Sequence, residues 1–458
     1  MGQIDFSNSA KNILEYAGIK ESDRDKVISA INSYASLNDQ FSSDDSVRKL
    51  RKELNSYFYE IYKLVFFRTM EEGQIPDEVL MFLFFGYIDE KLAGEENTQK
   101  LYEASKSIGL DEEMRIFTFY QWLRLIYNGK KDPSVNEFSE DYITKLRKMK
   151  REGSITEAEE RTLLHDGRKR VIFEIDSMFK NGNRMMSDRI TTFVPFFSEQ
   201  AVSKPIENTL LGFEIIHKTL NIIRAVDFSL FYRQTVFAAP ELGLDRAFIQ
   251  VEVLPDIILM PCVGARGAMW QEITGAKRTT PGRFLLPIAM EEELSKVLLG
   301  LCGEFRWELC KRIQGARWND LTERSLTSDY VDYIDTYKKN HDLSVEAKER
   351  ITAAMAKHRK SYKEMFVADY VTYIQYESSG AIRHNKVVRL ILFNYCPFSK
   401  AVREGAIATN PQYVQLIEKY KNKNAHDIHL FDIATGRIEK GGHQIPEELR
   451  GHSIYLRL

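Results

Sequence analysis

The sequence predicts a mainly α-helical protein with a minor β element near residues 246–262 and a small C-terminal β piece. Apolar residues recur at helical spacing along most of the chain, and capping residues or helix breakers separate these stretches. Strand-like patterns are confined to a few short segments. The 458 residues exceed one ordinary core, since a domain takes about 150 residues, so several packed units are expected.

Residues 1–151 predict an N-terminal helical unit. Apolar residues at 47, 50, 54, 57, 61 and 64 alternate in steps of three and four, which places them on one face of a long helix. Residues 43–45 supply capping side chains at its start. The apolar run at 79–88 (VLMFLFFGYI) predicts a buried core helix. Further helices are expected over residues 96–107, 112–127 and 136–151.

Residues 152–405 predict the main helical body. Ser154 and Glu157 have the form of a capping box, in which two side chains satisfy unpaired helix amides. A basic run at 145–151 precedes this point and acidic residues follow it, which favours a solvated helical hairpin over a nucleic-acid patch. Residues 181–183 predict a turn, residues 191–197 a strand or an extended connection, and residues 206–232 helices.

A Gly/Pro-rich insertion at residues 246–287 holds the best strand candidates. Residues 248–254 (FIQVEVL) alternate, and residues 257–260 (IILM) form an apolar run between two prolines. Residues 261–283 then predict an irregular segment. Such a long segment inside a compact chain is either functional or a sign that elements within it have been missed. Helices are expected again over residues 291–317, 328–340, 344–378 and 386–395.

Residues 406–458 predict a C-terminal tail. One helix is expected after Asn410. Residues 427–433 and 453–458 predict two short extended pieces that could pair as a small hairpin.

Composition and charge narrow the function classes. The 64 basic and 66 acidic residues nearly cancel, so general nucleic-acid binding is not expected. The four cysteines form no CxxC pair, which predicts buried reduced thiols rather than a disulfide framework or a zinc site. Neither a signal peptide nor an apolar run of the roughly 20 residues that span a bilayer is found. These features predict a cytoplasmic protein without a membrane span.

Standard catalytic motifs are missing from the sequence. It contains no GxxxxGK[ST], GxGxxG after a strand, HExxH, GxSxG or DxDxDG. Glu214 and His217 have the spacing of carboxylate-bridged metal helices, but no second copy exists. The histidines at 426, 429 and 443 are interpreted as surface residues. No metal or other cofactor is expected, and the sequence argues against an enzyme without excluding one.

The predicted helix at 291–317 gives a first candidate site. Glu308 and Arg312 fall within its apolar stripe one turn apart, in the orientation of an i, i+4 ion pair. A buried ion pair is costly unless structure or function requires it. Two interpretations stay open: a structural pair with aromatic packing, or a polar pocket lined by Glu308, Arg312, Arg317 and Asp320.

The irregular segment gives a second candidate. Arg266, Arg278 and Arg283 lie there with Lys277, against the single acid Glu272. Neighbouring glycines would let backbone amides approach a phosphate or carboxylate. The alternative is that these arginines pair with acids elsewhere. A small anionic ligand would use the combined set of Arg266, Glu272, Arg278, Arg283, Glu308, Arg312, Arg317 and Asp320.

Three segments have distinctive sequences: residues 255–264 (PDIILMPCVG), 269–273 (MWQEI) and 305–320 (FRWELCKRIQGARWND). They resemble a region of uncharacterised bacterial proteins, many from clostridia and spirochaetes, and the similarity extends over about residues 75 to 400. Some of those proteins also carry a cyclic-nucleotide-binding domain. The resemblance implies a bacterial cytoplasmic protein, an output or partner of second-messenger signalling. It supplies no catalytic residue, and the chain lacks the Gly-Glu and Arg phosphate cassette of a cyclic-nucleotide β-roll.

Three functions follow as hypotheses. The first is a non-enzymatic interaction or signalling protein that binds a protein partner or itself. The second is an enzyme or small-ligand binder with an Arg/Glu-lined anion pocket, in which arginines hold the anion and a carboxylate acts as base. The third is a self-assembling structural protein.

Overall fold

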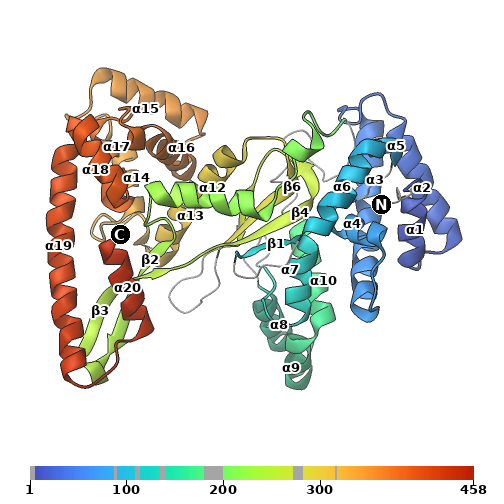
Figure 1. Cartoon of the computed structure of the whole chain (residues 1–458), viewed down its shortest axis with the longest axis horizontal. Coiled ribbons are helices and arrows are strands. Elements are labelled where there is room, and N and C mark those ends of the chain that lie inside the picture. Colours follow the sequence, from blue (N-terminus) through green and yellow to red (C-terminus); the bar gives the residue numbers. More distant parts are fainter. Residues whose placement is uncertain are drawn as a thin grey trace. The chain divides into compact units, whose positions relative to one another are not determined.

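The computed structural model describes residues 6–86, 90–108, 114–134, 141–179, 200–271, 282–314 and 317–458 (Figure 1). The mainly α prediction is confirmed. The chain forms two compact units: unit 1 comprises Met1–His217, Asp256–Glu272 and Arg283–Val297, and unit 2 comprises Lys218–Pro255, Ile273–Gly282 and Leu298–Leu458. The predicted domain boundaries near residues 151 and 405 stay predictions.

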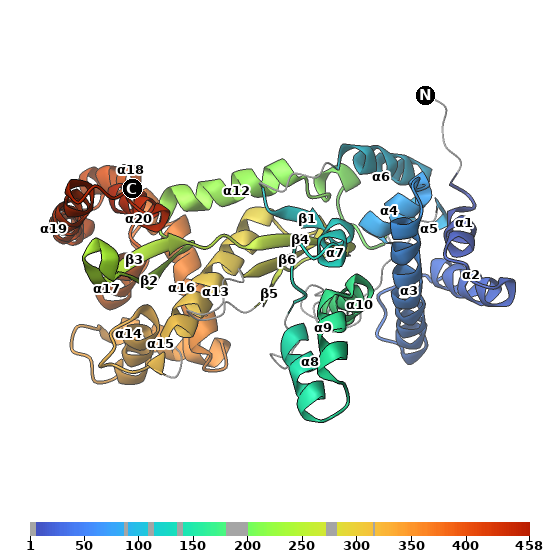
Figure 2. The same cartoon turned by 90° about the horizontal axis from the view of Figure 1, so that it is seen from below.

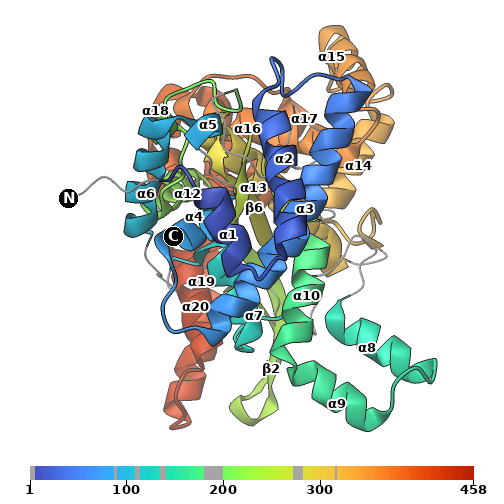
Figure 3. The ribbon, with the colours of Figure 1, turned by 90° about the vertical axis from the view of Figure 1, so that its right-hand side faces the viewer.

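Unit 1 begins with three helices that lie side by side in Figure 3: α1 (Ser9–Tyr16), α2 (Glu21–Ala35) and α3 (Asp45–Glu71). The predicted long helix is α3. Of its predicted stripe, residues 47, 54 and 61 are buried and residues 50 and 57 are half-buried, whereas Leu64 is exposed. The predicted core helix is α4 (Asp77–Phe85). Phe58 of α3 packs edge-on against Phe82 of α4, with ring centroids 5.3 Å apart.

The other helices of unit 1 follow in chain order: α5 (Glu90–Ala93), α6 (Glu95–Ser107), α7 (Phe119–Tyr127), α8 (Tyr142–Arg151), α9 (Glu157–His165), α10 (Gly167–Ser177) and the 3-10 helix η2 (Ile206–Asn208). Helices α8 and α9 form the predicted helical hairpin (Figure 2), joined by an ion pair between Lys150 and Glu160. The capping box lies two residues later than predicted, at Thr156 and Glu159. The reason is that the Ser154 amide bonds back to the Met149 carbonyl at 2.9 Å and so belongs to the end of α8.

A four-stranded sheet completes unit 1, in the order β1–β4–β6–β5. Strands β1 (Ile116–Thr118), β4 (Asp256–Gly264) and β6 (Arg283–Met290) are parallel, and β5 (Ala268–Gln271) is antiparallel to β6. The predicted strand at 257–260 is the buried centre of β4. The irregular segment predicted at 261–283 is partly wrong, because residues 261–264 belong to β4 and residues 268–271 form β5. Residues 283–290 form β6, which the sequence did not predict and which is buried along its whole length. An apolar run without alternation carries no strand period, which explains why β6 was missed.

Unit 2 contains a β-hairpin and a set of helices. Strands β2 (Tyr232–Ala239) and β3 (Leu244–Glu252) pair antiparallel through the 3-10 helix η3 (Pro240–Leu242) and Gly243, whose φ is +72°. The helices are α14 (Leu326–Thr336), α15 (Val345–Lys357), α16 (Tyr362–Gln375), η5 (Glu377–Ser379), α17 (Lys386–Tyr395), α18 (Lys400–Thr409), α19 (Pro411–Lys440) and α20 (Glu447–Arg457). Helices α12 (Phe213–Val226) and α13 (Leu294–Gln314) each contain a boundary between the units.

The predicted C-terminal β piece is wrong. Residues 427–433 lie within the 30-residue helix α19, and residues 453–457 lie in α20. A seven-residue window shows apparent alternation, whereas the full stretch buries residues of one helical face, including Tyr413, Ile417 and Ile438. Ile438 packs with Leu449 of α20 and Ile249 of β3 in a separate small core.

Two further predictions concern membrane spans and the elements expected at residues 181–183 and 191–197. Among the described residues, no helix combines the length and apolarity that a bilayer crossing needs. The predicted turn at 181–183 and the strand candidate at 191–197 lie outside the described residues.

Candidate functional site

Unit 2 encloses a cavity of about 1310 Å³. Its walls come from the β2–β3 hairpin, α13, the start of α14, the end of α17, α19 and α20. Figure 1 shows α19 running past this region, with α17 and α18 beside its N-terminal half and the hairpin and α20 beside its C-terminal half. Residues 416–435 of α19 therefore form one long wall of the cavity.

One stripe of α19 faces the cavity. Its lining residues recur at helical spacing and are Leu416, Lys419, Tyr420, Lys423, Asn424, Asp427, Leu430, Phe431, Ala434 and Thr435. At 1.5 Å per residue this stripe is roughly 28 Å long. The N-terminal half of the stripe is basic and polar, and the C-terminal half is mostly apolar.

Besides the buried Arg306, which is described below, five cations line the cavity: Arg233, Arg246, Arg324, Lys419 and Lys423. None of them forms an ion pair with another described residue, although Arg246 lies over the Phe248 ring at 4.9 Å. The Nε of Arg233 is buried and has no hydrogen-bond partner among the described residues. These groups are left to water or to a ligand.

Only two carboxylates, Asp329 and Asp427, are among the described residues that line the cavity. Asp329 Oδ2 accepts a hydrogen bond from the Tyr395 hydroxyl at 2.8 Å. Burial, and then this bond, raise the pKa of Tyr395, so its hydroxyl stays a donor. Five cations thus face two carboxylates, and the cavity is electropositive.

His452 of α20 contributes an aromatic face. Its Nδ1 accepts the Gln250 amide of β3 at 3.1 Å. Its ring meets Phe431 edge-on at 5.2 Å and lies parallel to Tyr455 at 6.3 Å. Burial lowers the pKa of His452, with Asp427 acting against that change. The neutral ring is the form that can accept the Gln250 hydrogen bond.

The base of the cavity is a buried Arg306 on α13. Its guanidinium donates to the Tyr395 carbonyl at 2.7 Å, to Cys396 Sγ at 3.2 Å and to the Ser229 carbonyl and hydroxyl. It also contacts Asp227 at 3.3 Å. Arg306 is therefore a structural cation, because its donors are already engaged within the protein.

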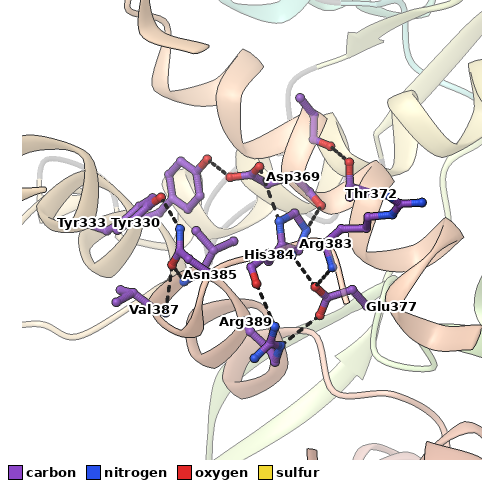
Figure 4. A network of polar contacts seen from close by, with 12 residues as sticks. Tyr330, Tyr333, Asp369, Thr372, Glu377, Arg383, His384, Asn385, Val387 and Arg389 are labelled. Carbon is purple, nitrogen blue, oxygen red and sulfur yellow. Dashed lines mark hydrogen bonds and ion pairs between the residues drawn. The ribbon is translucent and has the colours of Figure 1, made fainter. Parts of the chain in front are cut away.

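A polar network centred on Glu377 holds α17 in place (Figure 4). Glu377 accepts the backbone amides of Arg383 and His384 at 2.9 and 2.6 Å, the Arg389 guanidinium at 3.3 Å and the Tyr413 hydroxyl. Burial raises the pKa of Glu377, but these hydrogen bonds outweigh it and the net pKa is lowered. The carboxylate is thus ionised and fixes the N-terminal end of α17 against α19.

A second part of this network joins α14, α16 and the segment before α17. The Tyr330 hydroxyl donates to Asp369 at 2.6 Å, and His384 Nδ1 lies 3.8 Å from the same carboxylate (Figure 4). Asn385 caps α17 by accepting the Val387 amide at 2.9 Å. Together these contacts set the position of α17, whose far end carries Asn394 and Tyr395 to the cavity.

None of the candidate residues predicted in the insertion is among the described residues that line this cavity. Arg283 opens β6 and is buried: it donates to Ser134 Oγ and the Asp132 carbonyl at 2.5 and 2.8 Å and lies 4.5 Å from the Trp122 ring. Its guanidinium is 4.0 Å from Glu174. The prediction that it pairs internally holds for Arg283. Arg266 is exposed between β4 and β5, and Glu272 and Arg278 lie outside the described residues.

Three of the candidates predicted around α13 have polar partners among the described residues. Glu308 is half-buried and lies 3.7 Å from Lys363 Nζ of α16, while the Arg312 side chain lies outside the described part. Arg317 pairs with Glu323 at 2.9 Å, and Asp320 accepts the Thr322 amide at 2.9 Å. None of the described candidates lines the unit 2 cavity.

The cavity residues themselves were missed by sequence reasoning. Lys419 and Lys423 are spaced by one turn on the stripe that contains Leu416 and Tyr420, which is a readable signal once α19 is taken as one helix. The hairpin residues Arg233 and Arg246 gave no such signal, because only the tertiary fold brings them to α19.

Comparison with known proteins identifies one match. A family model described as a domain of unknown function (DUF8509) matches residues 315–455. This stretch includes α14 to α19 and most of α20, and so most of the helical wall of the cavity. No curated protein and no solved structure matches the chain.

Proposed function

We propose that unit 2 binds an anionic ligand in its cavity. The observation that supports this is the set of five cations without ion-pair partners among the described residues, facing two carboxylates. Charge-assisted hydrogen bonds from arginine and lysine to carboxylate or phosphate are shorter and about twice as strong as neutral ones. The unpartnered Arg233 Nε would gain an acceptor.

Asp329 accepts from Tyr395 and His452 Nδ1 accepts from the Gln250 backbone, so neither group is free to take up a proton at that atom. The lining cations outnumber the other lining carboxylate, Asp427, so an anion would find mainly donors in the cavity. The residues proposed to bind the ligand therefore differ from the candidate residues that the sequence indicated.

Calorimetric titration of the whole chain with inorganic tripolyphosphate tests this function. We expect saturable binding that weakens about tenfold or more, roughly 1.4 kcal/mol, in the double variant Lys419→Gln/Lys423→Gln. Lys421→Gln is the matched control, because Lys421 is exposed on the same helix and does not line the cavity. No saturable binding, or equal weakening in Lys421→Gln, would contradict the function.

The interaction or signalling role in a bacterial cytoplasm stays a proposal. An anion-binding helical module is compatible with it, since binding that distinguishes two states can act as an input. The exposed apolar side chains of Val236 and Phe248 on the hairpin are candidates for partner contact, at 51% and 54% exposure.

A further inference from the structure

We infer that the cavity accepts an acidic peptide segment of a partner protein, about eight residues long, with apolar side chains at one end. This inference rests on the proposed anion-binding function and specifies its ligand. Three properties of the cavity support it: its dimensions, the change of polarity along α19, and the unpaired edge of the hairpin.

The dimensions exceed those of an ordinary small-molecule site. Ligand pockets for small molecules hold about 300–1,000 Å³, whereas this cavity has about 1310 Å³. The α19 stripe of roughly 28 Å matches about eight residues of extended chain at 3.3 Å each. A small anion would occupy only the basic part.

The polarity of the wall changes along its length. Lys419 and Lys423 lie in the N-terminal half of the stripe, and Leu430 lies in the C-terminal half with 52% of its surface exposed. Phe248 of β3 also lines the cavity and is 54% exposed. Carboxylates would complement the lysines, and apolar side chains would cover Leu430 and Phe248, whose burial is favourable.

The hairpin offers main-chain contacts to an extended segment. Strands β2 and β3 form a two-stranded sheet, so among the described strands each has a single partner. The Gln250 amide of β3 is already taken by His452. Tyr232, Arg233 and Gln234 of β2 line the cavity, and addition of a peptide strand to an open sheet edge is a common mode of recognition.

Selection from a displayed library of random ten-residue peptides tests the inference on the purified full chain. We expect enriched sequences in which two or more acids precede or follow aliphatic or aromatic residues. Fluorescence anisotropy with a synthesised enriched peptide should show binding that weakens about tenfold in Lys419→Gln/Lys423→Gln. Lys421→Gln is expected to bind like the unaltered chain.

A further variant separates the inference from the proposed function. Leu430→Ser alters an exposed side chain and should fold normally. We expect it to weaken the peptide several-fold and to leave tripolyphosphate binding unchanged. If tripolyphosphate binds but no acidic–apolar peptide is enriched, or if this variant leaves peptide affinity unchanged, the inference is wrong and the anion-binding function stands. If neither probe binds, both are wrong.

Discussion

Arg306 shows how much one buried residue can hold together. It lies on α13 and contacts residues from the segment after α12 and from the end of α17. A guanidinium has five N–H donors, and here they meet backbone, hydroxyl, thiol and carboxylate acceptors. Tyr370 completes the arrangement by donating to Asp227 Oδ2 at 2.8 Å.

Replacing this cation should destabilise unit 2 strongly. In Arg306→Met, Asp227 would stay buried without its counter-charge, and breaking a buried pair in this way costs about 3–5 kcal/mol. Tyr370→Phe removes one hydrogen bond from the same carboxylate and should cost about 1 kcal/mol. Urea unfolding followed by circular dichroism measures both. Equal losses of unfolding free energy in the two variants would show that the Arg306–Asp227 ion pair is not the main stabilising contact of Asp227.

Sequence reasoning found the right helix and the wrong residues on it. The apolar pattern at 291–317 correctly predicted the helix α13, but the candidates chosen on it were Glu308 and Arg312, which are one turn apart. Arg306 has its carboxylate partner at Asp227, 79 residues earlier. No local spacing reveals such a pair, because the fold alone brings the two side chains together.

At the scale of elements, a hydrogen bond from Gln250 of β3 to His452 ties α20 to β3, in addition to the apolar contact of Leu449 with Ile249. The tie requires a neutral Nδ1, and the lowered pKa of His452 is consistent with that requirement. Asp427 from α19 is the carboxylate that opposes this effect, and Phe431 and Tyr455 cover the ring. Protonation would place an N–H against the Gln250 N–H.

The hydrogen bond from Gln250 to His452 predicts that the stability of the folded chain depends on pH. The folded-state pKa lies below the ordinary value of 6.5, so the unfolded chain takes up the proton more readily. The contribution of His452 is therefore complete above pH 6.5 and is lost as the pH falls through the folded-state pKa. Thermal melts at pH 7.5 and 5.5 should differ by a few degrees less in His452→Asn than in the unaltered chain. His429→Asn, at an exposed position on α19, should leave the difference unchanged; an equal effect there would contradict the assignment.

Whether a helix or strand could be predicted depended on how regularly its apolar residues recur in the sequence. The stripe of α3 and the run of α4 were predicted because both length and spacing were distinctive. Strand β6 was missed because it is buried throughout, and residues 427–433 of α19 were misread because seven residues cannot separate a helix from a strand. The α8–α9 hairpin was predicted from its charge pattern and from helix-breaking residues. The observed capping box lies two residues later than the predicted one.

For the whole molecule, a net charge of −2 conceals a local excess of positive charge in the unit 2 cavity. The count of charges predicts no strong overall field, and it cannot reveal a cluster assembled from residues between 233 and 423. Of the candidate site, only the lysines of α19 were readable. The arginines of the hairpin and of the α14 entrance required the fold.

Self-assembly stays a prediction for the whole molecule. Light scattering coupled to gel filtration checks it across a hundredfold range of concentration. We expect a mass above the 53.2 kDa of one chain if the exposed hairpin residues Val236 and Phe248 form a contact between copies, and Phe248→Ser should then return the mass toward that of one chain. A mass of one chain at every concentration would contradict self-assembly.

The four cysteines differ in burial, and this difference makes the one in the cavity wall suitable for selective labelling. Cys262, Cys302 and Cys396 are buried, and burial raises the pKa of each thiol, so all three react poorly as nucleophiles. Cys310 is half-buried and lies in the cavity wall. A thiol-reactive fluorophore on the unaltered sequence would thus report from inside the cavity, and no cysteine would have to be added or removed.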